Sequence, residues 1–359
     1  MKLSYSQDSW ERIGSSTYPV CMYGMGNGAD KIIEVLERKG ISVSDFFASN
    51  GFVRGHSFRG KKVLSYSEAK EKHGRMTAVL AFGSQLPDVH SAFRIIMSEQ
   101  LFIVPFVPVS GEGLFDKDFL ENNADKIDEV YEMLSDERSK NVFRDVIEFN
   151  FSGDASFLFS GSAGTDDVFG GILDPSCYRN AADLGAYTGD TASVLGDASP
   201  LLDTVIAVEP DEKNFRKLSL MAESYDGPGR IVPVCAAAGK ENGTASFLQT
   251  GNRNSSLSEQ GNREVVTVSV DEISDGMKLD LIKYDVEGAE REAILGSEKQ
   301  IRGNAPDLIV SVYHRREDIF SIPLMLKKIQ PKYSLYLRRK MYVPAWDVQL
   351  IATANCRRL

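Results

Sequence analysis

Two stretches of this chain alternate short apolar runs with helical segments whose apolar residues recur at helical spacing. The first begins with a predicted strand at 18–23, followed by a glycine-rich turn at 24–28 and a helix at 29–39. The second begins with a strand at 180–185 and a helix at 189–195. Because strands joined by helices pair in parallel, this order predicts an α/β fold with two parallel sheets, each covered by helices.

These patterns divide the chain into three regions. Residues 1–110 are predicted to form a small α/β domain. Residues 111–164 are predicted to form a connector, because their charged, helical pattern indicates one or two helices. Residues 165–359 are predicted to form a larger α/β domain. Two strands in direct succession at its end, 333–339 and 348–354, indicate an antiparallel pair that closes the sheet.

Composition disfavours several classes of protein. Of the 359 residues, 42% are hydrophobic and 26% are charged, which is typical of a globular protein. The net charge of −10 argues against general binding to nucleic acid or anionic membranes, since both need a basic surface. The longest apolar run, 101–109, is too short to span a bilayer, and residues 1–12 lack a signal-peptide pattern, so we expect a cytoplasmic protein. The four cysteines have no metal-ligand spacing, and we predict no metal site.

The segment Ala182-Asp-Leu-Gly-Ala-Tyr-Thr-Gly-Asp-Thr191 lies between a predicted strand and a predicted helix. Gly185 permits a tight turn there, and Gly189 permits close approach of a ligand and of the helix. The carboxylate of Asp183 suits a ligand that carries an ammonium group and a positive sulfonium. The next strand ends at Glu209, 24 positions after Gly185, where an acid binds the ribose diol in such sheets. Together these features predict a nucleoside site at the carboxyl edge of the sheet.

Three motifs then stand out: 183–191, Val208-Glu-Pro-Asp211, and Leu281-Ile-Lys-Tyr-Asp-Val-Glu-Gly-Ala-Glu290. They resemble the FkbM family of S-adenosylmethionine-dependent methyltransferases, and the resemblance covers about residues 165–355. It implies a class I methyltransferase fold, which is Rossmann-like with seven strands, and S-adenosylmethionine as cofactor. It also implies O-methylation, often of sugar or polyketide hydroxyls. We therefore expect methyl transfer to a hydroxyl of a carbohydrate or a similar polyhydroxylated acceptor.

The predicted cofactor-binding residues come from the glycine loop and from the ends of the neighbouring strands. They are Asp183, Gly185, Ala186, Tyr187, Thr188, Gly189, Asp190, Thr191, Glu209, Pro210, Cys235, Ala236 and Asp285. Asp190 and Thr191 could instead cap the following helix. The backbone of Cys235 and Ala236 is expected near the adenine, although a place in a buried strand explains these small residues equally well. The polar residues 254–256 are further candidates for binding the acceptor or the cofactor carboxylate.

Asp285, Glu287 and His314 are the predicted catalytic residues. They follow two main strands of the sheet, so they reach the carboxyl edge, where ligands bind in open α/β sheets. If the strand extends to residue 287, side-chain alternation places both carboxylates on one face, where they could hold a metal, share a proton, or act as a base and an orienting group. Glu287 could instead cap a helix that begins near Ala289. His314 is expected to be the base for an acceptor hydroxyl, with a structural histidine as the alternative.

The N-terminal segment Tyr23-Gly-Met-Gly-Asn-Gly28 resembles the extra Rossmann-like module of some family members, with Asp45 near a ribose-binding position. This module is expected to have a structural or nucleotide-sugar-recognition role, with NAD binding as the alternative. Two other functions stay open for the chain: an NAD-linked oxidoreductase that uses this loop, and a nucleotide-binding scaffold without turnover. The expected partners are a small-molecule or glycan acceptor and no nucleic acid. A homo-oligomer is left open.

Overall fold

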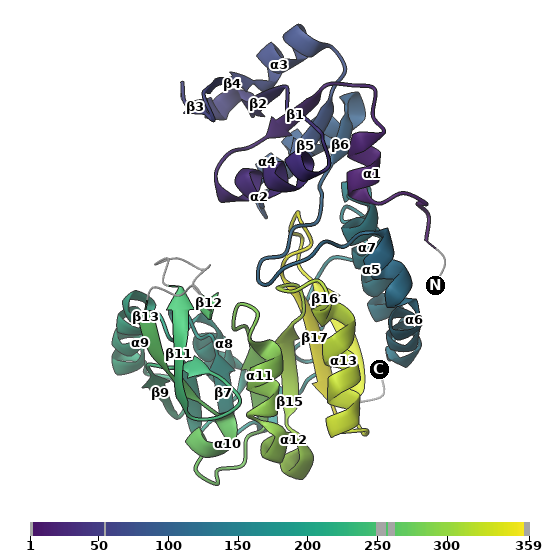
Figure 1. The fold of residues 1–359 in the computed structure, drawn as a ribbon. Coiled ribbons are helices and arrows are strands. Elements are labelled where there is room, and N and C mark those ends of the chain that lie inside the picture. The colour runs from purple at the N-terminus through teal and green to yellow at the C-terminus, as the bar shows by residue number, and fades with distance from the viewer. Residues whose placement is uncertain (1–2, 54, 249–255, 258–262, 355–359) are drawn as a thin grey trace.

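The computed structural model describes residues 3–53, 55–248, 256–257 and 263–354, and its ribbon is shown in Figure 1. The N-terminal module contains α1 (Ser9–Gly14), β1 (Val20–Tyr23), α2 (Asn27–Arg38), β2 (Asp45–Ala48), η1 (Asn50–Phe52), β3 (Ser57–Phe58), β4 (Lys61–Ser65), α3 (Tyr66–His73), β5 (Thr77–Leu80), α4 (Pro87–Glu99) and β6 (Leu101–Ile103). The connecting region contains α5 (Lys117–Asn122), α6 (Ala124–Met133), α7 (Glu137–Ser152), η2 (Ala155–Phe157) and η3 (Pro175–Cys177).

The C-terminal module contains the remaining elements. They are β7 (Asn180–Leu184), α8 (Asp190–Ala198), β8 (Thr204–Val208), α9 (Glu212–Ser224), β9 (Arg230–Val234), β10 (Ala237–Ala238), β11 (Gly243–Leu248), β12 (Ser256–Leu257), β13 (Arg263–Val268), α10 (Val270–Ile273), β14 (Leu281–Tyr284), α11 (Glu290–Leu295), α12 (Glu298–Asn304), β15 (Asp307–Ser311), α13 (Asp318–Ile329), β16 (Ser334–Arg339) and β17 (Val348–Thr353).

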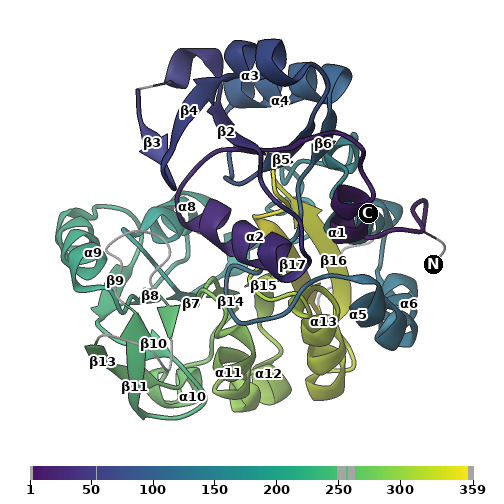
Figure 2. The same ribbon diagram turned by 45° about the horizontal axis from the view of Figure 1, so that its top comes forward.

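The N-terminal module is built on a twisted sheet with the strand order β3-β4-β2-β1-β5-β6. Strands β4, β2, β1, β5 and β6 run parallel, which was predicted for all of them except β4, and β3 pairs antiparallel with β4. The pair β3 and β4 was not predicted, because 57–65 is short and largely polar. The predicted strand at 101–109 ends at Ile103, since Pro105 and Pro108 cannot donate to a sheet. Figure 2 shows this module lying above the larger one.

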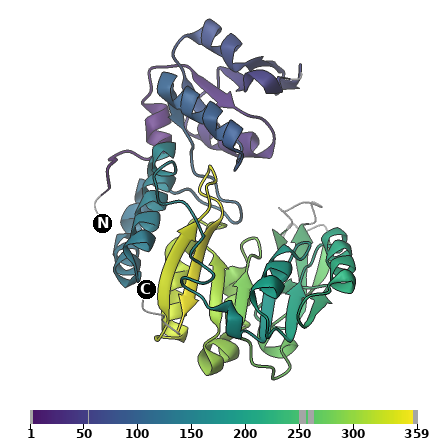
Figure 3. The ribbon, with the colours of Figure 1, turned by 180° about the vertical axis from the view of Figure 1, so that it is seen from behind.

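The connecting region folds into α5, α6 and α7 in place of the predicted one or two helices. Two of these helices begin at an aspartate whose side chain accepts a hydrogen bond from the first turn: Asp116 from Phe119 N–H, and Asp136 from Ser139 N–H. Helix α7 packs against β16 at the edge of the larger sheet. Figure 3 shows the three helices beside the β16–β17 hairpin.

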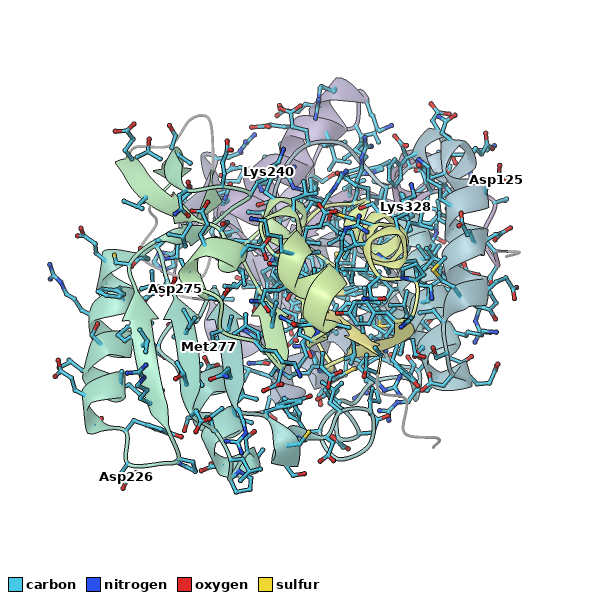
Figure 4. The ribbon with its side chains drawn as sticks, turned by 90° about the horizontal axis from the view of Figure 1, so that it is seen from below. Asp125, Asp226, Lys240, Asp275, Met277 and Lys328 are labelled. Atoms are coloured by element: carbon cyan, nitrogen blue, oxygen red, sulfur yellow. The ribbon has the colours of Figure 1, made fainter. Side chains whose placement is uncertain are left out.

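The described residues of the C-terminal module form a seven-stranded sheet with the order β16-β17-β15-β14-β7-β8-β9. Strand β17 runs antiparallel to both β15 and β16, and the other strands are parallel. This confirms the prediction of a methyltransferase-like sheet with an antiparallel final pair. A second, smaller sheet has the order β10-β13-β11-β12. Figure 4 views the molecule from below and labels residues that come before three strands of the larger sheet. Asp226 precedes β9, Asp275 and Met277 precede β14, and Lys328 lies in the last turn of α13, before β16.

The two modules meet through the turn between β16 and β17. Since β16 is parallel to β15, this turn lies at the carboxyl edge of the larger sheet. Its Val343 forms two backbone hydrogen bonds with Ser84, which follows β5 at the carboxyl edge of the six-stranded N-terminal sheet. Gly83 is packed so closely against Tyr342 and Trp346 that a Cβ there would overlap both rings. The carboxyl edges of the two sheets are therefore held together at this turn.

Candidate active site

The glycine loop is pressed between two strand ends of the larger sheet. Gly185 N–H and Ala186 N–H both donate to the carbonyl oxygen of Val208 at the end of β8, over 2.9 and 3.0 Å. On the other side, a Cβ on Gly185 would overlap the carbonyl oxygen of Asp285. Gly185 also has a φ of +80°. Only glycine meets both conditions without strain, so this position fixes the path of the loop.

Glu209, directly after β8, is hydrogen-bonded to the glycine loop. Its buried carboxylate accepts hydrogen bonds from Tyr187 N–H and Asp211 N–H, both over 2.9 Å. Burial raises the pKa of this carboxyl to about 7, and the two backbone donors only partly oppose that effect. A carboxylate has about four lone-pair sites, so Glu209 can still accept from the hydroxyls of a bound ligand. This residue type at this strand end fits the predicted ribose-binding role.

Asp183 lies deeper than the loop. Its side chain is fully buried, and its Oδ1 accepts from Lys283 Nζ over 3.1 Å; the two residues are register partners on β7 and β14. The ammonium group beside Asp183 is thus that of Lys283. Burial alone would lower the pKa of Lys283, but the carboxylates of Asp183 and Asp285 raise it. The predicted contact of Asp183 with the cofactor stays a prediction.

Asp285, Glu287 and His314 come together, as the strand order predicts. His314 Nε2 lies 3.8 Å from Asp285 Oδ1 and 3.5 Å from Glu287 Oε2. On its other side, Nδ1 lies 2.7 Å from Glu290 Oε1. The imidazole is fully buried, and the side chains of Asp285 and Glu287 are 35% and 23% exposed. The two carboxylates are therefore open to a substrate, whereas the histidine lies behind them.

The position of His314 is as predicted, but its surroundings do not suit a general base. Burial would lower the pKa of its imidazole, yet the three carboxylates of Glu290, Glu287 and Asp285 raise that pKa to about 10. His314 thus keeps its proton near neutral pH and cannot accept another from a hydroxyl. The raised pKa of its imidazole therefore disfavours the general-base role predicted for His314.

The route by which the two carboxylates converge also differs from the prediction. Strand β14 ends at Tyr284, so strand alternation does not apply to residues 285 and 287. The chain instead turns through Glu287, which has a φ of +54°. Glu287 does not cap the next helix either. Among the described residues, no side chain caps α11, which begins at Glu290. Glu290 instead holds the turn before it, since its Oε1 accepts from Val286 N–H over 3.0 Å and Gly288 N–H over 3.4 Å.

Asp285 stays ionised in this setting. Its Oδ1 accepts from Ser311 Oγ over 2.8 Å, and its Oδ2 lies 3.9 Å from Lys283 Nζ. Burial would raise the pKa of Asp285, but the charges of Lys283 and His314 lower it below its usual value. Glu290 and Lys283 complete this cluster, and neither is among the site residues predicted from the sequence. An acid in the first turn of a helix that follows Gly288 is the signal that could have revealed Glu290.

The remaining predicted cofactor residues line the same edge. Gly189, with a φ of +91°, is the N-cap of α8 and no side chain caps that helix, so Asp190 and Thr191 are not its caps. Thr188 and Thr191 are half-buried, Asp190 is exposed, and Pro210 follows Glu209. Cys235 is exposed and Ala236 is buried just after β9. Of the polar candidates 254–256, residues 254 and 255 lie outside the described residues, and 256 belongs to β12.

In the N-terminal module, the glycine-rich segment follows β1 and leads into α2, as predicted. Asp45, in contrast, starts β2 and therefore lies at the opposite, amino edge of that sheet. There it pairs with Lys72 over 2.8 Å and with His73 over 2.6 Å. The predicted ribose-binding position for Asp45 is therefore wrong, because the preceding loop is longer and the strand shorter than expected.

Membrane spans and metal clusters were also considered for residues 3–53, 55–248, 256–257 and 263–354. These residues contain no helix that is long and apolar enough to cross a membrane. Within the same ranges, no group of three or more histidine, cysteine, aspartate and glutamate side chains has an arrangement that could hold a metal ion.

Comparison with known proteins agrees with this geometry. Residues 183–338 match the family described as the Methyltransferase FkbM domain. The solved structure of methyltransferase FkbM from Methylobacillus flagellatus KT has a TM-score of 0.73 at 17% identity, over 94% of this chain and 90% of that chain. Fibrillarin from Aeropyrum pernix, solved with natively bound S-adenosyl-L-methionine, has a TM-score of 0.33 at 13% identity, over 50% of this chain and 69% of that chain. No curated protein matches the sequence. The chain is a methyltransferase with an FkbM methyltransferase domain over residues 183–338.

Proposed function

We propose that the protein is an S-adenosylmethionine-dependent O-methyltransferase that acts on a hydroxyl of a carbohydrate or similar polyhydroxylated acceptor. The observation that carries this proposal is the pair of half-buried carboxylates, Asp285 and Glu287, beside the glycine loop and Glu209. Carboxylates accept hydrogen bonds and cannot donate them when ionised. They are therefore suited to an acceptor that presents several hydroxyl donors.

The residues present fit S-adenosylmethionine. Glu209 would accept from the ribose hydroxyls, and the glycine loop at 185–189 would lie against the rest of the nucleoside. Cys235 and Ala236 would border the adenine. When bound, this cofactor supplies a methyl group on a positive sulfonium, which leaves as a neutral thioether. The protein therefore needs to align the acceptor and take its proton, without having to stabilise a charged leaving group.

The charges of the site favour Asp285 and Glu287 as the groups that orient the acceptor hydroxyl and receive its proton. His314 faces both with its Nε2 and keeps a positive charge behind them. Placing a hydroxyl next to an electrophile in line can supply ~7–11 kcal/mol of the barrier, and a general base adds roughly 10²–10⁴-fold. Alignment by the two carboxylates is thus the larger contribution expected of this site.

Calorimetric titration of the full chain with S-adenosylhomocysteine tests the cofactor, and titration with NAD serves as the control. We expect micromolar binding of S-adenosylhomocysteine that is lost in Glu209→Ala. Binding of NAD alone would instead identify the N-terminal glycine-rich segment as the working site and overturn the proposal.

Mass spectrometry then tests the acceptor. The protein is incubated with S-adenosylmethionine and a panel of sugars, nucleotide sugars and glycans, next to a panel of amines and thiols. We expect a gain of one methyl group on a hydroxyl of the first panel, and a loss of transfer in Asp285→Asn. Methylation confined to amines or thiols would contradict O-methylation while leaving the cofactor assignment intact.

A further inference from the structure

We propose that Ser110 is a positioning residue for the methyl-transfer site, contributed by the segment that arrives from the N-terminal module. Residues 104–116 join β6 to α5 and are called the module linker here. Ser110 lies at its centre and contacts the segments that carry Glu287 and His314. This inference rests on the proposed function, because it assigns Ser110 the task of fixing the Glu287 carboxylate at that site.

A single serine joins the ends of two neighbouring strands. Ser110 Oγ donates to the carbonyl oxygen of Glu287 over 2.6 Å, three residues after β14 ends. Ser110 N–H donates to the carbonyl oxygen of His314 over 2.9 Å, three residues after β15 ends. The peptide groups of a predicted catalytic carboxylate and of its neighbouring imidazole are therefore both hydrogen-bonded to the same residue.

The contact is closely packed as well as hydrogen-bonded. Gly288 has a φ of +98°, and a Cβ there would overlap the side chain of Ser110. Arg315 Nε donates to the carbonyl oxygen of Gly288 over 2.7 Å, and Arg316 Nη1 donates to that of Leu114 over 2.9 Å. The chain that follows His314 thus binds the module linker at Leu114 and also binds Gly288, the residue that packs against Ser110.

The hydrogen bond from Ser110 holds a strained backbone. Glu287 is not glycine and yet has a φ of +54°. A left-handed conformation is strained for a non-glycine residue, so it persists only where surrounding contacts impose it. The carbonyl that Ser110 Oγ holds belongs to this residue. If that donor is lost, the peptide can rotate, and the Cα–Cβ bond that directs the carboxylate rotates with it.

The carboxylate of Glu287 faces the buried imidazole of His314. It approaches His314 Nε2 at 3.5 Å, which is too long for a strong hydrogen bond. The imidazole is held more firmly from the other side, by Glu290 over 2.7 Å. A rotation of the Glu287 backbone would therefore change the approach of its carboxylate to His314, and the hydrogen bond from Ser110 opposes that rotation.

Enzyme kinetics of the full chain test this role with three variants. Ser110→Ala removes the hydroxyl, and Ser110→Thr restores one. Ser98→Ala is the matched control, because Ser98 Oγ also donates to a carbonyl, that of Ile95, but on the exposed face of α4. We expect kcat of Ser110→Ala to fall by roughly 10- to 100-fold, the size of effect that a small misplacement produces. Affinity for S-adenosylhomocysteine and the melting temperature should stay at wild-type values, and Ser110→Thr should recover most of kcat.

A merely structural role would lower the melting temperature or cofactor affinity together with kcat. Either of those results would overturn the proposal, and so would a kcat for Ser110→Ala equal to that of Ser98→Ala.

Histidine NMR supplies a readout that does not depend on the acceptor. The chain has only four histidines, so His314→Gln identifies the signal of His314. The groups that face His314 are Asp285, Glu287, Glu290, Asp318 and the ring of Tyr313. Because Glu287 helps to raise the pKa of His314, its displacement in Ser110→Ala should move the His314 titration to lower pH, and Ser98→Ala should leave it in place. An unmoved titration would overturn the positioning role.

The two readouts also separate this inference from the proposed function. If the wild-type protein neither binds S-adenosylhomocysteine nor transfers a methyl group, the proposed function fails, and the His314 titration still decides whether Ser110 positions Glu287. If the titration moves but kcat does not change, the contact exists and its role in methyl transfer is refuted.

Discussion

Charged side chains of alternating sign lie along the carboxyl edge of the larger sheet. Asp183, Lys283, Asp285, His314 and Glu290 follow one another, with 2.7–3.9 Å between the charged atoms of neighbours. Each inner charge has an opposite charge on both sides, which offsets much of the cost of burying it. Asp285 is the most exposed of the central three, at 35% of its side chain. The row therefore presents one carboxylate to the open edge and keeps its cations behind it.

The raised pKa of His314 predicts how stability depends on pH. A group whose folded-state pKa of about 10 exceeds its unfolded value of about 6.5 stabilises the fold fully below pH 6.5 and loses that contribution as pH rises through 10. His314→Gln leaves buried carboxylates without their cation, which we expect to cost about 3–5 kcal/mol near neutral pH. Urea denaturation of both proteins measures this. The difference in unfolding free energy should be largest near pH 6.5 and should shrink toward pH 10; a constant difference would show that His314 is neutral.

The raised pKa of Glu209 predicts how cofactor binding depends on pH. Hydroxyl donors of a bound ribose favour the ionised carboxylate, which is the minor form below its pKa of about 7. The affinity for S-adenosylhomocysteine should therefore rise about tenfold from pH 6 to pH 8, with release of a proton. Calorimetry in two buffers of different ionisation enthalpy measures both effects. Glu209→Gln should bind more weakly and independently of pH, and an unchanged pH dependence in that variant would rule out Glu209 as its source.

At the scale of single residues, the sequence reveals those site positions that directly follow a strand within a short motif. The glycine loop, Glu209 and Asp285 could be predicted because each follows a recognisable apolar strand. The roles of Lys283 and Ser110 could not, since they depend on which strands become neighbours and on a segment about 177 positions away from Glu287. The protonation of His314 was also out of reach, because it results from three carboxylates that only the folded chain brings together.

At the scale of elements, the loop after β7 owes its shape to two glycines with different neighbours. A Cβ on Gly185 would overlap the backbone oxygen of Asp285, which cannot move without shifting the end of β14. A Cβ on Gly189 would overlap the methyl group of Met221, the far end of a flexible side chain. Both residues have positive φ, so alanine is strained at either position.

This difference predicts the outcome of two matched substitutions. Gly189→Ala should destabilise the protein by about 1–2 kcal/mol, mainly through its backbone conformation. Gly185→Ala should cost more, roughly 3 kcal/mol or above, because backbone strain and a clash with Asp285 add together. Thermal denaturation measures the order. Equal losses would mean that the end of β14 can shift to make room for the added methyl group.

Element lengths show why helices were easier to predict than strand ends. Helix α9 begins after Asp211, whose side chain accepts hydrogen bonds from the first turn, and an aspartate in this position is a helix-start signal that the sequence shows directly. No comparable signal in the sequence marks the end of strand β14. Its apolar pattern continues to Val286, while the structure ends the strand at Tyr284 because Asp285 turns toward Lys283 and Ser311. Local sequence therefore encodes helix caps, but contacts across the sheet decide where a strand ends.

At the scale of the whole molecule, the connecting helices belong to the core of the larger sheet. Strand β16 is its outer strand, and α7 covers it. The edge is also hydrogen-bonded: Ser135 N–H donates to the carbonyl of Leu335, and the hydroxyls of Ser135 and Ser139 accept from Leu335 N–H and Leu337 N–H. An uncovered strand edge invites aggregation, so these contacts protect the sheet.

This arrangement predicts the behaviour of two truncated proteins. Residues 165–359 alone lack α7 and expose β16, so we expect an aggregated or unfolded product. Residues 111–359 keep α7 but lack Ser110, and they should be soluble and bind S-adenosylhomocysteine with strongly reduced turnover. Size-exclusion chromatography and calorimetry distinguish the two. A monomeric, stable 165–359 protein would show that the helices are dispensable for the fold.

The module linker has a consequence for exchanging parts between related enzymes. Its residues follow the N-terminal sheet in the chain, yet Ser110 and Leu114 are bound by residues that follow β14 and β15. A chimera that takes a new N-terminal module should therefore be joined near residue 104, so that Ser110 stays with the glutamate and histidine it was matched to. Joining the parts at the start of α5 would take Ser110 from one parent and its partners Glu287 and His314 from the other.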